Sequence, residues 1–355
     1  ANQMRPTYVL NRGQYDQPKK NEIVTPGVPA AFPPPPDGAP ANRLGLAQWL
    51  TRPDHPLTAR VAVNRFWQLF FGEGLVRSTE DFGLQGEVPS HPELLDALAV
   101  DFVGSGWDVK RLVKQLVTSE TYRQSSAVTP ALRERDPDNR LHARGPRFRL
   151  QAEFIRDSAL FVSGLYVEKV GGPSVRPYQP AGIWEEVAID TGLSRFVQDK
   201  GEGLYRRSLY TYWKRSSPHP AMMAFDAPTR EKCTGTRSRT NTPLQALVTL
   251  NDPQYVEAGR AFAERIVRAG ASPADRIQFA IKAALGRPAT EREVALLSKL
   301  AESQSERFRA EPKKAAALLA VGESKRDESI PAAEHAAWAV VAATVLNLDE
   351  FLVKN

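Results

Sequence analysis

Five side chains in the middle of the chain are suited to acid–base chemistry. Glu185 and Glu186, with Asp190 close behind, follow a glycine- and proline-rich stretch, and His219 and Asp226 come further along. General acid–base catalysis on a carbohydrate would require these groups, together with nearby arginines, to meet in one cavity. The alternative is that the acidic run lies on an exposed turn and that Asp226 is the N-cap of a helix.

A second chemistry, the binding of an anion, is indicated by arginines that precede a helix start. Arg230, Arg237 and Arg239 are followed by Asn241 and by a predicted capping box at Thr242, with proline at the first helical position and glutamine at the third. Free helix N–H groups and guanidinium donors both favour a negative group. The alternative is that these arginines pair with carboxylates elsewhere in the domain.

Three polar residues interrupt a helix that is expected over residues 57–71. Arg60, Asn64 and Gln68 have the spacing i, i+4 and i+8, so they share one helix face. They either form a polar network that meets solvent or line a binding site. We expect them to face one cleft together with the arginine-rich stretch.

The aromatic residues Tyr178 and Trp184 lie in a long loop, residues 166–204. Loops of this length inside a compact domain are usually functional or lie over a site. The two rings would either stack on a sugar at the rim of the cleft or anchor the loop to the core.

Helix-start signals predict a mainly α fold. Ser90, Thr242 and Thr290 each begin a capping box that is followed by a periodic apolar segment. The alternation of residues 208–215 predicts a strand, and residues 7–10 form a second candidate. The expected architecture is a helical, bundle-like domain with a small β-sheet and long loops.

The proline content divides the chain. Residues 1–43 are expected to form an extended proline-rich arm or linker, since proline runs favour polyproline and turn conformations. Residues 44–355 are expected to form one large, mainly helical domain. The alternative is a subdivision near residue 205, into 44–204 and 205–355.

The charge of the chain favours polyanionic partners only mildly. Its net charge is +6 over 355 residues, and its isoelectric point is about 9.4. The sequence contains no zinc finger, RNA-recognition signature or basic helix, which argues against nucleic acid. A sulfated or uronic polysaccharide would meet the same charge requirement.

Cysteine and histidine usage limits metal and redox chemistry. Cys233 is the only cysteine, and the five histidines are far apart in the sequence. We therefore expect no disulfide within the chain and no thiolate or histidine metal site, while oxygen ligands for calcium stay open. No apolar run reaches membrane-spanning length. The chain begins without a leader, which is expected of a cytoplasmic protein, of a processed chain or of a piece of a longer one.

Several long strings resemble one family, the C-terminal domain of unknown function of exported planctomycete proteins. The resemblance extends from Arg5 to Leu352. It is carried by NRFWQLFFGEGLVRSTEDFGLQGEVPSHPELLD (64–96), SGWDVKRLVKQLVTSETYRQSS (105–126), GGPSVRPYQPAGIWEEV (171–187), YRRSLYTYWKRSSPHPAMMAFDAPTREKC (205–233) and RTNTPLQALVTLNDP (239–253).

The resemblance implies a setting for the chain. Members of this family typically lie behind a cytochrome c domain and a second planctomycete-specific domain, and they carry a signal peptide. This chain has no haem-attachment motif, because Cys233 is followed by Thr234. The resemblance therefore implies export to the periplasm, with haem c on a separate N-terminal domain, and an association with electron transfer or polysaccharide use.

Two functions follow from the residues and the resemblance together. The first is an accessory or binding module that recognises an anionic glycan or docks the cytochrome c domain. The second is the catalytic domain of a cytochrome c-linked carbohydrate-active enzyme, with acid–base residues in the region 178–245. The first is favoured, because the sequence contains no recognisable catalytic constellation.

Overall fold

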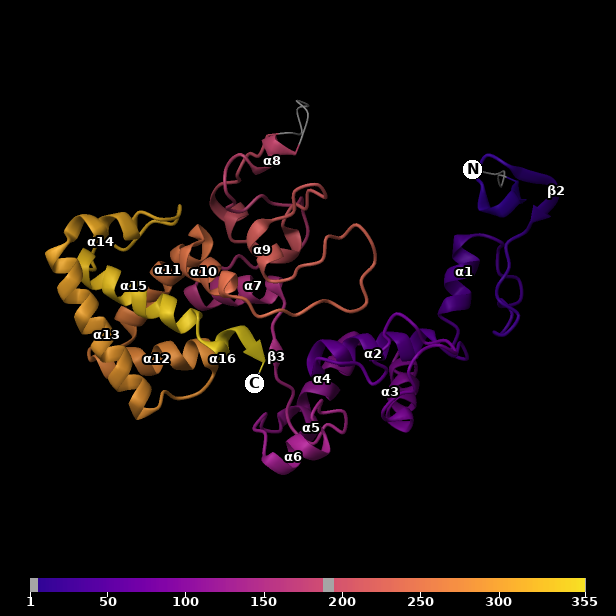
Figure 1. The fold of residues 1–355 in the computed structure, drawn as a ribbon, viewed down its shortest axis with the longest axis horizontal. Helices are drawn as coiled ribbons and strands as arrows, with labels where there is room; N and C mark the ends of the chain where they lie inside the picture. Colours follow the sequence, from indigo (N-terminus) through magenta and orange to yellow (C-terminus); the bar gives the residue numbers. More distant parts are fainter. Residues whose placement is uncertain (1–5, 188–194, 355) are drawn as a thin grey trace. The chain divides into compact units, whose positions relative to one another are not determined.

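The computed structural model describes residues 6–187 and 195–354. Asp190, one of the expected acid–base residues, lies outside this range. The chain forms two compact units. Unit 1 comprises Ala1–Gln124 and Val128–Arg144, and unit 2 comprises Ser125–Ala127 and Gly145–Asn355. Within the described residues the fold is mainly α, as predicted, with two small two-stranded sheets (Figure 1).

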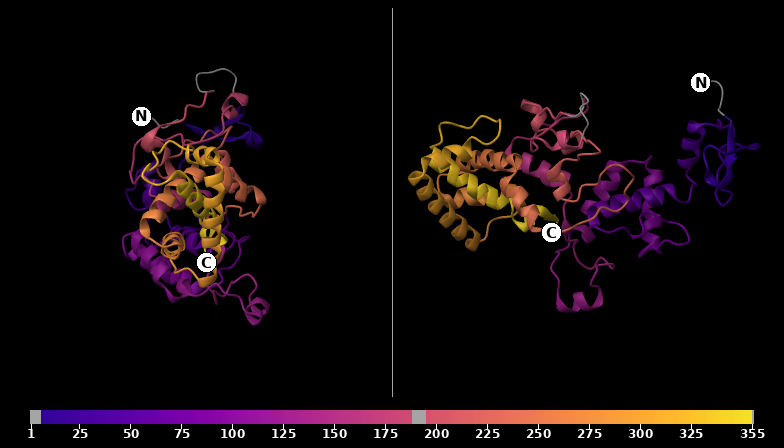
Figure 2. Two further views of the ribbon diagram at one scale, coloured as in Figure 1. Left: turned by 90° about the vertical axis from the view of Figure 1, so that its left-hand side faces the viewer. Right: turned by 45° about the horizontal axis from the view of Figure 1, so that its top comes forward.

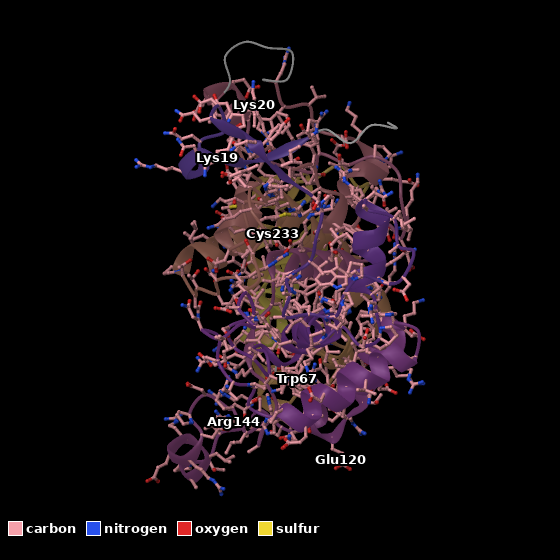
Figure 3. The ribbon with its side chains drawn as sticks, turned by 90° about the vertical axis from the view of Figure 1, so that its right-hand side faces the viewer. Lys19, Lys20, Trp67, Glu120, Arg144 and Cys233 are labelled. Carbon is pink, nitrogen blue, oxygen red and sulfur yellow. The ribbon has the colours of Figure 1, made fainter. Side chains whose placement is uncertain are left out.

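Unit 1 begins with an antiparallel β-hairpin. Strand β1 (Thr7–Leu10) pairs with β2 (Pro18–Val24), which carries the Lys19 and Lys20 labels in Figure 3. The strand predicted at residues 7–10 is therefore confirmed. The proline-rich segment that follows contacts the helix at residues 43–50, where the Trp49 indole donates to the carbonyl of Pro33 at 2.7 Å.

Six α-helices follow in the described part of unit 1, and three of them, at residues 58–71, 92–104 and 109–118, share an apolar core that includes Trp67 and Leu98. They are α1 (Arg43–Leu50), α2 (Thr58–Phe71), α3 (Pro92–Gly104), α4 (Val109–Thr118), α5 (Glu120–Arg123) and α6 (Pro130–Arg135). The capping box predicted at Ser90 is wrong: His91 is the N-cap of α3, and in the described structure no side chain caps this helix. The Ser90 hydroxyl instead lies 3.0 Å from the His91 ring.

Unit 2 is built around two long helices, α11 (Pro253–Ala269) and α15 (Ala332–Leu346). Figure 2 shows the yellow α15 among the orange helices of this unit. The other elements are β3 (Phe148–Arg149), α7 (Ala152–Ser163), α8 (Ile183–Glu186), η2 (Gly201–Leu204), η3 (Ser208–Tyr210), α9 (Pro220–Ala224), α10 (Pro243–Asn251), α12 (Pro273–Leu285), α13 (Glu291–Ala310), α14 (Pro312–Leu319), α16 (Asp349–Leu352) and β4 (Val353–Lys354). Thr290 and Glu293 form the predicted capping box of α13.

The strand predicted over residues 208–215 is wrong. Ser208 begins a short 3₁₀ turn, because the Asp157 carboxylate on α7 accepts hydrogen bonds from its N–H at 2.8 Å and its hydroxyl at 2.6 Å. Buried Arg156 also donates to the carbonyls of Leu204 and Arg206. Tertiary contacts from α7 thus override the alternating pattern.

Every helix in residues 6–187 and 195–354 is too short or too polar to cross a membrane.

Candidate functional site

A pocket of about 460 Å³ lies at the start of α10 in unit 2. Three arginines line it: Arg147 and Arg149 come from the segment at β3, and Arg239 precedes α10. The lining also includes Phe148, Thr240, Asn241, Thr242, Gln245, Ala246, Asn347, Asp349, Leu352 and Val353. Arg147 pairs with Asp349 and Arg149 with Asp226, so two carboxylates stand against the three arginines and the local charge is mildly positive.

Arg149 lines the pocket and is held in place by several hydrogen bonds. Its guanidinium bonds Asp226 at 2.5 Å, the Thr240 carbonyl at 2.9 Å and the Phe225 carbonyl at 3.2 Å. The two charged side chains are largely buried, with 9% and 18% of Arg149 and Asp226 exposed. Strand β3, which pairs with β4, therefore fixes the position of Arg149 beside the pocket.

Asp226 is a structural acceptor of this network. Its carboxylate accepts hydrogen bonds from the N–H and the hydroxyl of Thr240. Partial burial works against ionisation, but the bonds from Thr240 and the charge of Arg149 outweigh it and lower the pKa of Asp226. The backbone of Asp226 is left-handed, with φ of 58°, a conformation that aspartate tolerates better than most residues.

Asp226 does not start a helix, contrary to the N-cap alternative. It follows the short helix α9, and the described residues between Ala227 and Thr242 form a loop. The Asp226 carboxylate, which would cap a helix, instead accepts a hydrogen bond from the N–H of Thr240.

The capping box predicted at Thr242 is also wrong, although a helix does begin there. Thr242 is the N-cap of α10, but within the described residues no side chain caps this helix. The reason is the orientation of Gln245. Its side chain turns inward and donates to the carbonyls of Ala224 and Thr240, both at 3.1 Å, rather than back to Thr242.

Two of the predicted anion-binding arginines have carboxylate neighbours inside unit 2. Arg237 bonds Glu153 at 2.7 Å. Arg230 lies 3.8 Å from the same carboxylate and 4.4 Å from the centre of the Trp213 ring. Arg239 lines the pocket and stacks 4.4 Å above Phe148.

The candidate acid–base residues lie in different local environments, each with its own neighbours. His219 is buried, and its Nε2 lies 2.8 Å from the Tyr178 carbonyl. Burial, with the charge of Arg156, lowers the pKa of His219 to about 4, so the ring is neutral at pH 7. Glu185 and Glu186 are exposed on α8. Among the described residues no hydrogen bond or ion pair joins His219, Asp226 and these glutamates.

Tyr178 and Trp184 are both buried, with 8% and 4% of each residue exposed. The Tyr178 hydroxyl accepts a hydrogen bond from the N–H of Glu323 at 2.8 Å. Lys214 and Arg176 lie against the Trp184 ring, at 4.4 and 5.8 Å from its centre. This burial fits the anchoring interpretation and leaves little ring surface for a sugar.

The three polar residues of α2, Arg60, Asn64 and Gln68, belong to unit 1, and Arg60 and Asn64 have hydrogen-bond partners there. Asn64 is fully buried and bonds both the N–H and the carbonyl of Val76 at 2.9 Å. Arg60 bonds Asp96 at 2.6 Å and the Pro56 carbonyl. Gln68, which is half-buried, is the third member. Asn64 thus holds the loop after α2 in place.

Sequence reasoning missed Arg147, Arg149, Asn347 and Asp349 as pocket residues. The only signal was the density of arginines before α7. Their carboxylate partners lie far along the chain, at Asp226 for Arg149 and Asp349 for Arg147. Spacing patterns report neighbours on one helix or strand, so they could not reveal these pairs.

The comparisons with known proteins give one match. A model of the family described as "PSD1: Protein of unknown function (DUF1553)" covers residues 42–301. No curated protein and no solved structure matches the chain. Since the family model covers most of the sequence, the chain belongs to the PSD1 family of proteins of unknown function (DUF1553).

Proposed function

We propose that this chain is a non-catalytic binding module that takes an anionic group of its ligand in the pocket at the start of α10. The observation that carries the proposal is the convergence of Arg147, Arg149 and Arg239 on one pocket with the uncapped start of a helix. Guanidinium groups bind carboxylate, sulfate and phosphate groups through paired hydrogen bonds, and a helix N-terminus adds to this preference.

Binding is favoured over catalysis by the placement of the acid–base candidates. His219 and Asp226 are each engaged by a nearby backbone or side-chain partner. A catalytic acid and base would have to meet at one reacting atom. Asp226 instead accepts hydrogen bonds from Arg149 and Thr240. These bonds position two residues that line the pocket.

The proposal includes the setting that the resemblance implies. The module would belong to an exported planctomycete protein and would act beside a cytochrome c domain and a second planctomycete-specific domain. Haem c would be carried by the cytochrome domain. The anionic group would come from a uronic or sulfated glycan, or from an acidic surface of the cytochrome.

The test is a titration of the protein with defined anionic probes. Isothermal calorimetry would compare a galacturonate hexasaccharide, a sulfated oligosaccharide and a neutral oligosaccharide of equal length, with an acidic c-type cytochrome as a separate probe. We expect Arg239→Ser to weaken binding of the anionic probe roughly tenfold or more, since a hydrogen bond to a charged group contributes about 1.5–3 kcal/mol. Binding should also weaken with added salt.

Arg292→Ser is the matched control, because Arg292 is an exposed arginine on α13 and lies outside the pocket lining. It removes the same charge from the same unit and should leave the affinity unchanged. Equal affinity of Arg239→Ser and the wild type for every anionic probe would refute the proposed function, as would equal affinity for the neutral oligosaccharide.

A further inference from the structure

Another pocket of unit 2 has a volume of about 1040 Å³, against about 460 Å³ for the α10 pocket. Helix α7 and the residues after it form one wall, which includes Phe154, Phe161 and Tyr166. The end of α12 and the segment around β4 form another wall. We call this pocket the aromatic groove. Small-molecule sites span about 300–1,000 Å³, so the groove can hold a ligand of several rings.

Two phenylalanines give the groove an exposed aromatic surface. Phe154 and Phe161 are 43% and 70% exposed. They are seven residues apart on α7, so they share one face of the helix and lie about 10 Å apart along its axis. The Tyr166 ring lies 6.3 Å from the Phe161 ring, and its hydroxyl accepts a hydrogen bond from Arg207 at 2.7 Å. The wall therefore presents separate flat rings to a ligand, and Arg207 holds the third ring in place.

The charged side chains that line the groove balance each other. They are Asp157, Glu168, Arg207, Arg287, Glu350 and Lys354. Arg287 and Glu350 pair at 2.6 Å. A hydrocarbon chain would cover these charged groups without replacing their contacts with water, and a polyanion would meet as many carboxylates as cations. A neutral sugar suits both parts of the lining, since its ring has apolar faces for the aromatic side chains and a polar edge for the charged ones.

The aromatic groove and the α10 pocket meet at the strand pair of β3 and β4. Arg149 of β3 lines the α10 pocket, and the next residue, Leu150, lines the groove. Asp349 and Glu350 divide in the same way, and Val353 of β4 lines both pockets. Neighbouring strands are only about 5 Å apart, so a ligand of several sugar units is long enough to occupy both pockets.

We propose that the two pockets form one extended site for an oligosaccharide that carries an acidic sugar at one end. The acidic sugar lies in the α10 pocket with Arg239, and neutral sugars stack on Phe154 and Phe161. These exposed rings take the part that was expected of Tyr178 and Trp184, which are buried. The inference rests on the proposed function and names its ligand as a glycan, not as an acidic protein surface.

The test is a calorimetric titration of the full chain with a series of glucuronate probes. The series is glucuronic acid alone, the same acid joined to one xylose and the acid joined to three xyloses, with neutral xylotetraose beside it. Affinity should rise about tenfold from the acid alone to the longest probe, because the added sugars cover aromatic rings. Phe161→Ala should remove most of that gain and leave the affinity for glucuronic acid alone unchanged. Phe154→Ala should show a smaller loss, because Phe154 is less exposed.

Leu296→Ala is the matched control, since Leu296 of α13 is 58% exposed and lies outside the lining of both pockets. It should leave the whole series unchanged, and thermal melts would verify that every variant folds. Equal affinity of the wild type for all lengths would overturn the inference, as would a full gain with length in both phenylalanine variants. Phe161-dependent binding of phage-displayed peptides, without any gain with saccharide length, would assign the groove to a protein segment and overturn it too.

The extended site and the proposed function fail in different ways. Arg239→Ser should weaken binding of every glucuronate probe, the acid alone included, because it acts in the α10 pocket. If Arg239 is needed but length and Phe161 have no effect, the proposed function stands and the extended site is rejected. If xylotetraose binds as tightly as the longest acidic probe and needs Phe161 but not Arg239, both the anionic pocket and the extended site are rejected.

Discussion

Two of the charge networks in unit 2 have a similar composition but differ in burial. In the closed network, Glu257 and Arg260 of α11 are 0% and 1% exposed. Glu257 accepts hydrogen bonds from the Tyr205 hydroxyl at 2.8 Å and from the N–H of Ser324 at 2.6 Å, while Arg260 donates to the Ser324 carbonyl. In the open network, Arg149 and Asp226 lie at the edge of the α10 pocket.

The closed network holds the fold, whereas the open network lies beside a pocket. Both networks pin a loop: Ser324 belongs to the loop before α15, and Thr240 to the loop before α10. In the closed network the charged groups are shielded from water and are stabilised by their protein partners. Loss of one partner should therefore lower the free energy of unfolding strongly. In the open network solvent and a ligand can reach neighbouring groups, so a change there should alter binding more than stability.

The largest effect is expected at Gly322, whose backbone passes over the closed network. Gly322 has φ of +92°, and a Cβ there would lie 2.3 Å from Cδ of Glu257. Gly322→Ala should lower the free energy of unfolding by about 3–5 kcal/mol, the usual cost of breaking a buried charge pair. Denaturant unfolding would measure the loss.

Gly286→Ala separates the clash from the backbone conformation. Gly286 is also left-handed, with φ of +72°, but a Cβ there would meet no atom within 4 Å. Its cost should be about 1–2 kcal/mol, from the left-handed backbone alone. Equal losses in the two variants would show that Glu257 can move aside, and that the closed network is looser than its burial indicates.

A second prediction concerns the effect of acid on the free energy of unfolding. It tests whether burial keeps the His219 ring neutral in the folded protein. Burial, together with the charge of Arg156, lowers the pKa of His219 in the folded protein from its ordinary 6.5 to about 4. The unfolded chain therefore binds this proton first, so the contribution of His219 to stability falls as the pH drops from about 7 to 4 and is constant above that window. The loss should approach about 3 kcal/mol at pH 4.

His219→Gln should flatten the dependence of unfolding free energy on pH between 7 and 4, measured by urea denaturation. His142 in unit 1 also has its pKa lowered to about 4, chiefly by burial, so His142→Gln should remove a separate part of the slope. An unchanged slope in His219→Gln would mean that solvent reaches the His219 ring in the folded protein.

The smallest effect is expected in the open network. Asp226→Asn keeps one acceptor for Thr240 but removes the charge opposite Arg149, so the free energy of unfolding should fall by only about 1–2 kcal/mol. Affinity for an anionic saccharide should rise about threefold, because a carboxylate would no longer balance the charge of Arg149. Calorimetry would measure it. Weaker anion binding in Asp226→Asn would contradict this. It would show that the main effect of Asp226 on affinity is to position Arg149 and Thr240, and not to balance the charge of Arg149.

The sequence predicted those features that depend on neighbours along the chain. The mainly helical fold, the capping box at Thr290 and the strand at residues 7–10 all follow local patterns. The boxes at Ser90 and Thr242 failed because Ser90 contacts His91 and because Gln245 is drawn inward by Ala224 and Thr240. A capping pattern therefore marked the helix start without fixing its hydrogen bonds.

The candidate site was predicted only in part for the same reason. Arg239, Asn241 and Thr242 were expected at a binding site and do line the pocket. Arg237 was expected there too but bonds Glu153 on α7. Partners such as Arg149 and Asp226 are distant in sequence, and their pairing depends on how the helices pack. A spacing pattern carries no information about that packing.

The pairing of β3 with β4 has a consequence for the order of folding. β3 is the first element of unit 2 and β4 is the last, and residues from both ends line the α10 pocket. Closing so long a segment costs conformational entropy, and contacts between distant residues therefore form slowly. During synthesis, β4 also leaves the ribosome after every other element of the unit. The pocket is thus completed after the rest of the unit, and a nascent chain that has not yet docked β4 presents an unfinished wall to any ligand.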